Sequence, residues 1–466
     1  MRLFLVLLSA FAVLRPSLAA QGADVDRPNI IFILADDLGY GDLGSYGQQR
    51  IRTPRLDRMS AEGMRFTQFY AGATVCAPSR SVLMQGLHTG HCRVRGNAGR
   101  KNPLAQALRP GDRTVASALQ EAGYATGLFG KWGLGDVGAA EPGLPRRHGF
   151  DAFFGYLNQH HAHNYYPTFL WRNEERVALP NLVPNEDDLG GGVSTNKSVY
   201  SPDLITAEAL GFIRNHKARP FFLLFTTTLP HANNEAGTNG MEIPDLGAYA
   251  HVDWPPAQRA HAAMIDRLDR DVGRILDLVD SLGLRERTLV LFTSDNGPHR
   301  EGGNQPDFND SNGPLRGIKR DLYEGGIRVP FIARWPGRIP AGTTSDVVGW
   351  FPDFFPTAVR LAGAPVPAGL DGLDLSPVLL GQGPLAGRGP LYWEFHEGGF
   401  KQAVRDGDWK AVRRSPAQPV ELYDLRSDPG ETRDLADANP SEVRRFAELF
   451  SSLRADSPDW PARTQQ

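Results

Sequence analysis

Apolar runs separated by amphipathic stretches are the feature that most constrains the fold of this 466-residue chain. The runs NIIFILA (29–35), FFLLFTT (221–227), TLVLFTS (288–294) and RVPFIARW (328–335) are hydrophobic at successive positions, not at alternate ones. Such continuity is typical of strands that are covered on both faces. Between them, residues 261–284 carry apolar side chains at helical spacing, and residues 114–130 indicate a helix and then a strand. The alternation predicts an α/β fold with helices on both faces of a largely parallel sheet.

The pattern changes after about residue 380. PLYWEF, FKQAVRDGDWKAVR and VELYDL are short strand candidates, and PSEVRRFAELFSSLRA indicates a final helix with Ser441 as its cap. We therefore expect a main domain over 27–380 and a small C-terminal α+β domain with a short antiparallel sheet over 381–466. Long Gly-, Pro- and Asn-rich loops at 135–148, 181–203 and 232–256 are expected to shape a pocket.

Residues 1–20 have the pattern of a signal peptide: an early arginine, an apolar run and small residues before Ala20. The run is too short to span a bilayer comfortably, so we expect an exported protein, periplasmic or secreted, without stable membrane insertion after cleavage. An uncleaved anchor is the alternative. Cleavage removes two arginines and no acid, which changes the formal net charge from −3 to −5. This acidic balance disfavours nucleic-acid binding, and an anionic substrate would need a local cluster of cations.

The chain has two cysteines, Cys76 and Cys92. Two cysteines do not make a disulfide framework, although a single bridge between them satisfies the count. Metal binding and nucleophilic catalysis are the other ordinary roles open to Cys76.

Polar residues follow several of the predicted strands. Asp36 and Asp37 come directly after the first apolar run, and Asp295 and Asn296 come directly after the third. In open α/β sheets, ligands bind at the carboxyl ends of strands. Three carboxylates and an amide oxygen suit Ca²⁺ or Mg²⁺ better than zinc, so the sequence predicts one such ion.

Basic residues occur at comparable positions. Lys131 follows the strand candidate TGLFG, His231 follows the run at 221–227, and Lys319 lies in GIKRDLYEGGIRVP. Each alone is typical of a solvated surface charge. Together with Arg80 they predict an anion pocket facing the metal.

The motifs CAPSRSVLMQGLHTGH and GYATGLFGKWGLG resemble the two signatures of the sulfatase family. PNIIFILADDLGYGDLGSYG, SDNG, GIKRDLYEGGIRVP and ELYDLRSDPGETRDLAD resemble that family in the same order, from about residue 27 to 440. The resemblance implies an alkaline-phosphatase-like α/β/α sandwich and the hydrolysis of sulfate esters.

The resemblance also implies that a maturing enzyme oxidises Cys76 to Cα-formylglycine, which hydrates to a gem-diol. One hydroxyl would attack sulfur and the other would expel sulfate. By analogy, Asp36, Asp37, Asp295 and Asn296 bind one Ca²⁺ or Mg²⁺, which also contacts the diol at position 76. The family further implies that Arg80 holds the diol geometry, Lys131 and Lys319 bind sulfate oxygens, and His231 protonates the leaving alcohol.

One departure from the family pattern concerns Gly133, because many members have histidine after the sequence Gly-Lys-Trp. That histidine is assigned to the step that eliminates sulfate. We expect a residue of NQHHAHNYY, first His161 and otherwise Gln159, to take over part of its role. A packing histidine is the alternative interpretation. Gln85 also stands where threonine is usual, which we expect to affect packing only.

Two other functions stay open at this point. Relatives with the same modified residue hydrolyse phosphonate or phosphate monoesters, and an inactive carbohydrate-binding relative is the non-enzymatic alternative. The stretch HHAHNYYPTFLW could stack on sugar rings, which would suit a sulfated oligosaccharide or a smaller sulfate ester as substrate.

Overall fold

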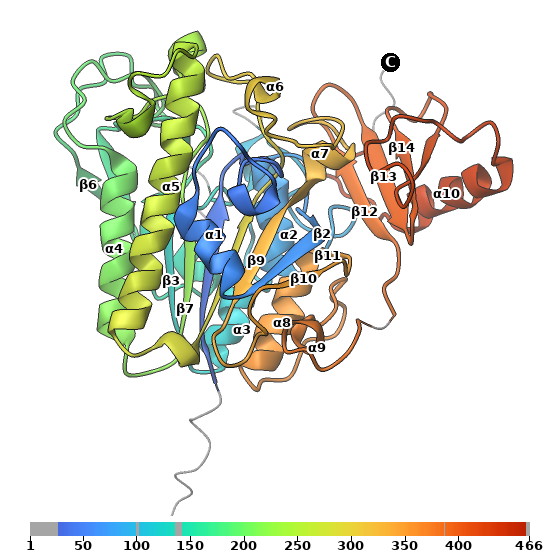
Figure 1. The fold of residues 1–466 in the computed structure, drawn as a ribbon, viewed down its shortest axis with the longest axis horizontal. Helices are drawn as coiled ribbons and strands as arrows, with labels where there is room; N and C mark the ends of the chain where they lie inside the picture. The colour runs from blue at the N-terminus through green and yellow to red at the C-terminus, as the bar shows by residue number, and fades with distance from the viewer. Residues whose placement is uncertain (1–26, 99–101, 136–141, 386, 463–466) are drawn as a thin grey trace, which may run out of the picture.

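The computed structural model describes residues 27–98, 102–135, 142–385 and 387–462, so the predicted signal peptide lies outside the described residues. Most of the chain is built on one eleven-stranded sheet with the order β10-β2-β9-β8-β1-β7-β3-β4-β5-β6, in which β11 pairs with β2 (Figure 1). Its strands are β1 (Asn29–Ala35), β2 (Met64–Tyr70), β3 (Ala125–Lys131), β4 (Ala152–Tyr156), β5 (Phe169–Arg172), β6 (Glu175–Ala178), β7 (Phe221–Thr226), β8 (Thr288–Ser294), β9 (Arg328–Arg334), β10 (Thr343–Ser345) and β11 (Gly349–Trp350).

The centre of this sheet is parallel, as predicted. Strand β1 lies between β7 and β8, and β3 joins β7 to β4, all in parallel register. The apolar run at 328–335 differs from the others, because β9 is antiparallel to both β2 and β8. Its continuous hydrophobicity reflects burial on both faces, which does not specify strand direction.

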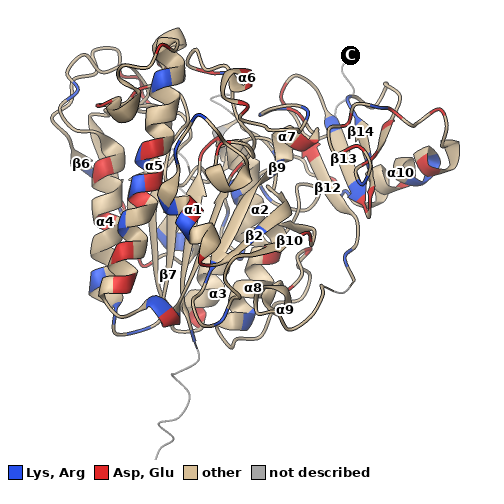
Figure 2. Ribbon diagram, viewed as in Figure 1, with Lys and Arg blue, Asp and Glu red and all other residues tan. Residues whose placement is uncertain are grey.

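Helices cover both faces of the sheet (Figure 1). Within β1, Ile30, Phe32 and Leu34 join one apolar core, while alternate residues join the core on the other face. Figure 2 shows charged residues along the outer helices α4 and α5, while the central strands are largely free of them. The helices of this part are α1 (Pro54–Ala61), α2 (Cys76–Gln85), α3 (Val115–Glu121), α4 (Ser201–His216), α5 (Pro256–Ser281), α6 (Pro306–Asn309), α7 (Glu324–Ile327), α8 (Phe354–Leu361) and α9 (Ser376–Leu379).

The helix predicted over 261–284 begins earlier than expected. It is α5, which begins at Pro256 because the first turn tolerates proline, and it ends at Ser281 before Gly283. No helix in the described segments has both the length and the apolar composition needed to cross a bilayer.

The C-terminal part forms a second, four-stranded antiparallel sheet of β12 (Leu391–Phe395), β13 (Lys401–Asp406), β14 (Trp409–Arg413) and β15 (Glu421–Asp424). Helix α10 (Pro440–Ser452) packs on one face through Phe446 and Phe450. The predicted cap at Ser441 is wrong. The helix begins at Pro440, two residues earlier than a cap at Ser441 implies, so Asn439 is at the cap position and makes no side-chain capping bond.

Candidate active site

The ends of two neighbouring strands bring the predicted acidic residues together. Strands β1 and β8 pair in register up to Ala35 and Ser294, so the residues that follow them meet. The Asp37 backbone N–H donates to Asp295 Oδ1 at 3.1 Å, and Asn296 Nδ2 donates to Asp37 Oδ1 at 2.7 Å. Asp36, Asp37, Asp295 and Asn296 are all fully buried.

A positively charged side chain forms an ion pair with each of the three carboxylates. Lys131 Nζ lies 2.6 Å from Asp36 Oδ2, and Lys319 Nζ lies 2.8 Å from Asp37 Oδ2. Arg80 contacts Asp295 Oδ2 at 2.8 Å and also donates to the Lys131 carbonyl at 2.6 Å. Burial alone would lower the pKa of both lysines, but the neighbouring carboxylates more than offset it and raise each pKa above its ordinary value. The lysines therefore stay charged within a buried site.

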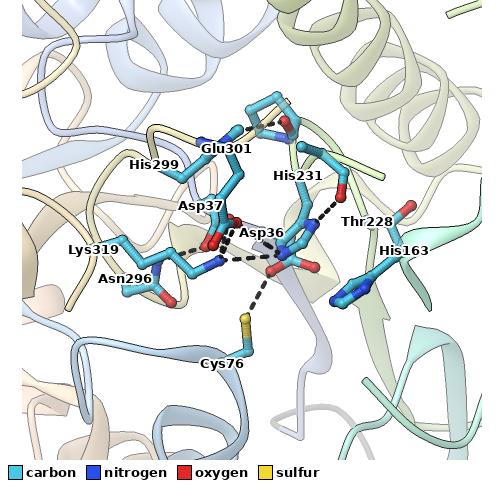
Figure 3. A network of polar contacts seen from close by, with 12 residues as sticks. Asp36, Asp37, Cys76, His163, Thr228, His231, Asn296, His299, Glu301 and Lys319 are labelled. Carbon is cyan, nitrogen blue, oxygen red and sulfur yellow. Dashed lines mark hydrogen bonds and ion pairs between the residues drawn. The ribbon is translucent and has the colours of Figure 1, made fainter. Parts of the chain in front are cut away.

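Cys76 is the first residue of α2 and lies beside these charges (Figure 3). Its Sγ is 3.3 Å from Asp36 Oδ1. Burial, together with the charge of Asp36, holds the pKa of its thiol well above the usual value. An unmodified cysteine here is therefore a thiol and a poor nucleophile. Cys76 and Cys92 are both free and buried, so the disulfide considered from the count does not form in this structure.

His231 lies across Asp36 from Cys76 (Figure 3). Its Nδ1–H donates to the Ala232 carbonyl at 2.6 Å, which leaves Nε2 facing Lys319 Nζ at 3.2 Å. Burial and the charge of Lys319 lower the pKa of His231 to about 3. The neutral imidazole thus accepts a hydrogen bond from Lys319.

Three further residues that the sequence analysis missed surround His231. His163 stacks on it at 5.0 Å between ring centroids with 10° between planes, and His299 lies at 5.9 Å with 20° between planes. Glu301 forms an ion pair with Lys319 at 2.8 Å. His299 and Glu301 follow Asn296 closely in the chain, so extending the strand-end argument a few residues would have found them.

His161 and Gln159, the two candidates for the role missing at Gly133, lie in different surroundings. The buried His161 ring packs on Tyr156 and Phe169 at 4.9 and 4.4 Å between centroids, and its contacts do not include the charged residues around Cys76. Gln159 instead lies against Gly133. The contacts therefore favour the second candidate.

The donor set fits a hard divalent cation. Asp36, Asp37, Cys76 and His231 each place a ligand atom within 4.8 Å of the others, and Asp295 and Asn296 adjoin Asp37. Asn296 Oδ1 is buried and has no hydrogen-bond partner among the described residues. Burial and the charge of Asp36 raise the pKa of Asp295 to about 7, while Arg80 and Lys131 act in the opposite direction. A Ca²⁺ or Mg²⁺ ion would satisfy the free oxygen of Asn296 and bind the carboxylates beside it.

Sequence comparisons show similarity to known protein families. The model of the family described as Sulfatase matches residues 28–364, and the model described as N-sulphoglucosamine sulphohydrolase, C-terminal, matches residues 318–455. N-acetylgalactosamine-6-sulfatase of Canis lupus familiaris is 36% identical over 434 residues, covering 88% of this chain and 75% of the relative. Arylsulfatase A of Bos taurus is 35% identical over 477 residues, covering 92% of this chain and 88% of the relative.

A structural comparison agrees with the sequence matches. The crystal structure of Ps i-CgsB in complex with k-i-k-neocarrahexaose superposes with a TM-score of 0.77 and 26% identity, covering 94% of this chain and 95% of that one. Together with the central parallel sheet and the small antiparallel sheet, this likeness confirms the expected alkaline-phosphatase-like architecture.

Proposed function

Because the chain belongs to the sulfatase family and is a sulfuric ester hydrolase, we propose that it acts on carbohydrate sulfate monoesters through a formylglycine made from Cys76. The observation that carries this proposal is the position of Cys76, between buried carboxylates and lysines at the start of α2. Its raised thiol pKa argues against catalysis by the cysteine itself. The hydrated aldehyde would supply a hydroxyl nucleophile where the thiol cannot.

The metal proposal rests on the oxygen donors. Asp36, Asp37, Asp295 and Asn296 would hold one Ca²⁺ or Mg²⁺, and the bound cation would stabilise negative charge on the nucleophile and on the transferring group. Arg80 links Asp295 to the end of β3, and we propose that it fixes the geometry of the nucleophile.

Lys131 and Lys319 are proposed to bind the sulfate oxygens. Both ammonium groups are buried and charged, and they approach the site from different segments of the chain. Placed in this way, they stabilise charge that develops on sulfate oxygens without large reorganisation.

His231 and Lys319 are proposed to deliver a proton to the leaving alcohol oxygen. The His231 Nε2 atom faces the site and already accepts from Lys319 Nζ. A proton passed through Nε2 reaches the ester oxygen, while the Ala232 carbonyl holds the ring through Nδ1–H.

Carbohydrate substrates are favoured by the names of the relatives. One is named N-acetylgalactosamine-6-sulfatase, and one related structure is a complex with k-i-k-neocarrahexaose. Export of the chain and its encounter with a formylglycine-generating enzyme are parts of the same proposal.

Three measurements test the proposal. Conversion of Cys76 lowers the mass of its peptide by about 18 Da, because an aldehyde replaces the CH₂–SH group. Hydrolysis of p-nitrophenyl sulfate should exceed hydrolysis of a phosphonate monoester, and release of sulfate from defined sulfated sugars should identify the substrate. An unconverted Cys76 in active protein, or a preference for phosphonate, would reject the proposal.

A further inference from the structure

Lys319 uses all of its hydrogen-bonding capacity within the protein. Its Nζ donates to Asp37 Oδ2 at 2.8 Å and to Glu301 Oε2 at 2.8 Å, and it lies 3.2 Å from His231 Nε2 (Figure 3). A lysine ammonium group has three N–H donors and no acceptor. An oxyanion that binds Lys319 must therefore share or take over one of these three bonds.

The bond to Glu301 is the one open to an incoming oxyanion. The side chains of Asp37 and His231 are 0% and 2% exposed, whereas that of Glu301 is 18% exposed. The proposed function also assigns Asp37 to the metal ion and His231 to proton transfer. An oxyanion held by Lys319 would therefore have the Glu301 carboxylate as its immediate neighbour.

Further contacts fix Glu301 in this position. Its Oε1 accepts from Arg320 Nη1 at 2.6 Å, and Arg320 Nε donates to Glu397 Oε2 at 3.0 Å. The Glu301 backbone N–H donates to His299 Nδ1 at 3.0 Å, so the other ring nitrogen of His299 donates to the Pro230 carbonyl at 3.2 Å. Both the backbone and the carboxylate of Glu301 are thus held, which keeps its charge close to Lys319.

The charge of Glu301 exceeds what Lys319 needs as a counter-ion. Along this chain of contacts three carboxylates meet two cations: Asp37, Glu301 and Glu397 with Lys319 and Arg320. Burial alone would raise the pKa of Glu301, but the charge of Lys319 lowers it well below its ordinary value, so Glu301 is ionised. Since Asp37 already neutralises Lys319, a neutral acceptor would serve as well at position 301.

We propose that Glu301 selects singly charged oxyanions, so that the site favours a sulfate monoester, with one negative charge, over a phosphate monoester or free sulfate, with two. This rests on the proposed function, in which Lys319 binds the sulfate group. The nearby carboxylate repels each charge on the ligand, and a second charge should lower the affinity by about tenfold. Hydrolysis turns a singly charged ester into doubly charged sulfate, so the same repulsion favours release of the product.

The first test uses two unreactive probes of similar shape that differ by one charge. In a mildly alkaline buffer, benzenesulfonate carries one negative charge and phenylphosphonate carries two. Calorimetry gives both dissociation constants without turnover. Glu301→Gln should tighten the binding of phenylphosphonate about tenfold more than the binding of benzenesulfonate, because one repelling charge is removed. Equal changes for the two probes would overturn the proposal.

Three further variants separate charge from shape. Glu301→Asp keeps the charge, so the ratio of its two dissociation constants should stay near that of the wild type; a shift equal to that of Glu301→Gln would overturn the proposal. Glu121→Gln is the matched control, because Glu121 is an exposed carboxylate paired with Arg113, and it should keep the wild-type ratio. Glu397→Gln should shift the ratio as Glu301→Gln does, but less. If Glu301→Gln does not fold, an unchanged ratio in Glu397→Gln overturns the proposal.

Kinetics separate failure of this selection from failure of the proposed function. Wild-type protein that binds both probes but does not hydrolyse p-nitrophenyl sulfate would reject the proposed function, and the ratio of dissociation constants would still decide the role of Glu301. In an active enzyme, Glu301→Gln should lower the inhibition constant of inorganic sulfate and raise kcat/KM for p-nitrophenyl phosphate relative to p-nitrophenyl sulfate. An active variant with the wild-type preference would overturn the role of Glu301 alone. Wild-type protein that binds neither probe would overturn both.

Discussion

Two buried ionic clusters in this protein use similar residues in different ways. The site cluster consists of Asp36, Asp37 and Asp295 with Arg80, Lys131 and Lys319. The interface cluster joins Glu324 of the main part to Lys410 and Glu431 of the C-terminal part, where Lys410 Nζ lies 2.9 Å from both carboxylates. All residues of the two clusters are buried.

The clusters differ in how completely their polar groups are paired. In the interface cluster, Tyr70 donates to Glu324 Oε2 at 2.6 Å, and the Glu324 N–H donates to Glu431 Oε2 at 2.6 Å. Glu431 Oε1 has no hydrogen bond among the described residues, but it forms the ion pair with Lys410. In the site cluster, Asn296 Oδ1, Arg80 Nε and the Gln159 carboxamide have no partners among the described residues. The interface cluster therefore holds two parts of the chain together, whereas the site cluster retains capacity for a cation and an oxyanion. Changes in the first should cost stability, and changes in the second should cost activity.

The largest expected effect comes from Cys76→Ala. It removes the atom from which the nucleophile is made, so kcat/KM for sulfate esters should fall by about 10³-fold or more. The free energy of unfolding should change by less than about 1 kcal/mol, because the thiol makes one polar contact. Steady-state kinetics and urea unfolding measure the two effects. Cys92→Ala is the matched control and should keep its activity; a tenth of wild-type activity in Cys76→Ala would refute the assignment.

Lys410→Met should instead lower the stability of the protein and leave its activity nearly unchanged. It leaves Glu324 and Glu431 without the cation that they share, which should destabilise the protein by about 3–5 kcal/mol. Activity per folded molecule should stay close to that of the wild type at low temperature. Lys217→Met, at an exposed position, should change stability by no more than about 0.5 kcal/mol. A large loss of activity in folded Lys410→Met protein would show that the clusters are coupled.

The sequence revealed the site cluster much better than the interface cluster. Asp36, Asp37, Asp295 and Asn296 follow apolar runs, so the rule that ligands bind at strand ends brings them together. Lys410 lies in a short alternating strand where a lysine is expected to face solvent, and its partners are 86 and 21 positions away. No local pattern predicts such a pairing.

The Gln159 contact illustrates a second limit. The motif around Gly133 indicated that a side chain was missing, but two residues of NQHHAHNYY were candidates for its place. The choice depends on the register of β3 with β4 and on the direction of each side chain after β4 ends. The antiparallel direction of β9 was hidden for a similar reason, because burial on both faces carries no information on direction.

Removing divalent ions should distinguish the clusters without any substitution. A ligand present at 100 times its dissociation constant stabilises the folded state by about 2.7 kcal/mol, so chelation should lower stability by a comparable amount and Ca²⁺ or Mg²⁺ should restore it. Thermal unfolding with and without chelator measures the shift. Asn296→Ala should reduce the shift and Glu431→Gln should preserve it. Equal shifts in wild type and Asn296→Ala would place the ion elsewhere.

The smallest effect concerns the pH dependence of the interface cluster. Burial and the charge of Glu324 raise the pKa of Glu431 from 4.5 to about 7, while Lys410 acts in the opposite direction. The folded state then holds a proton that the unfolded chain releases above pH 4.5. Stability from this group is complete below that pH and is lost as the pH rises toward 7. At 1.36 kcal/mol per pH unit, the loss between pH 5.5 and 7 is about 2 kcal/mol.

Glu431→Gln keeps a neutral group that can accept from the Glu324 N–H at every pH. Its free energy of unfolding should therefore fall less than that of the wild type between pH 5.5 and 7, as measured by urea unfolding in a series of buffers. Burial also raises the pKa of Asp42 to about 7, so Asp42 contributes to the pH dependence of both proteins. The contribution of Glu431 is therefore the difference between the slopes of wild type and Glu431→Gln. Identical slopes would mean that Lys410 alone neutralises Glu431. A smaller slope in the variant would mean that the interface cluster holds a proton on Glu431 below pH 7.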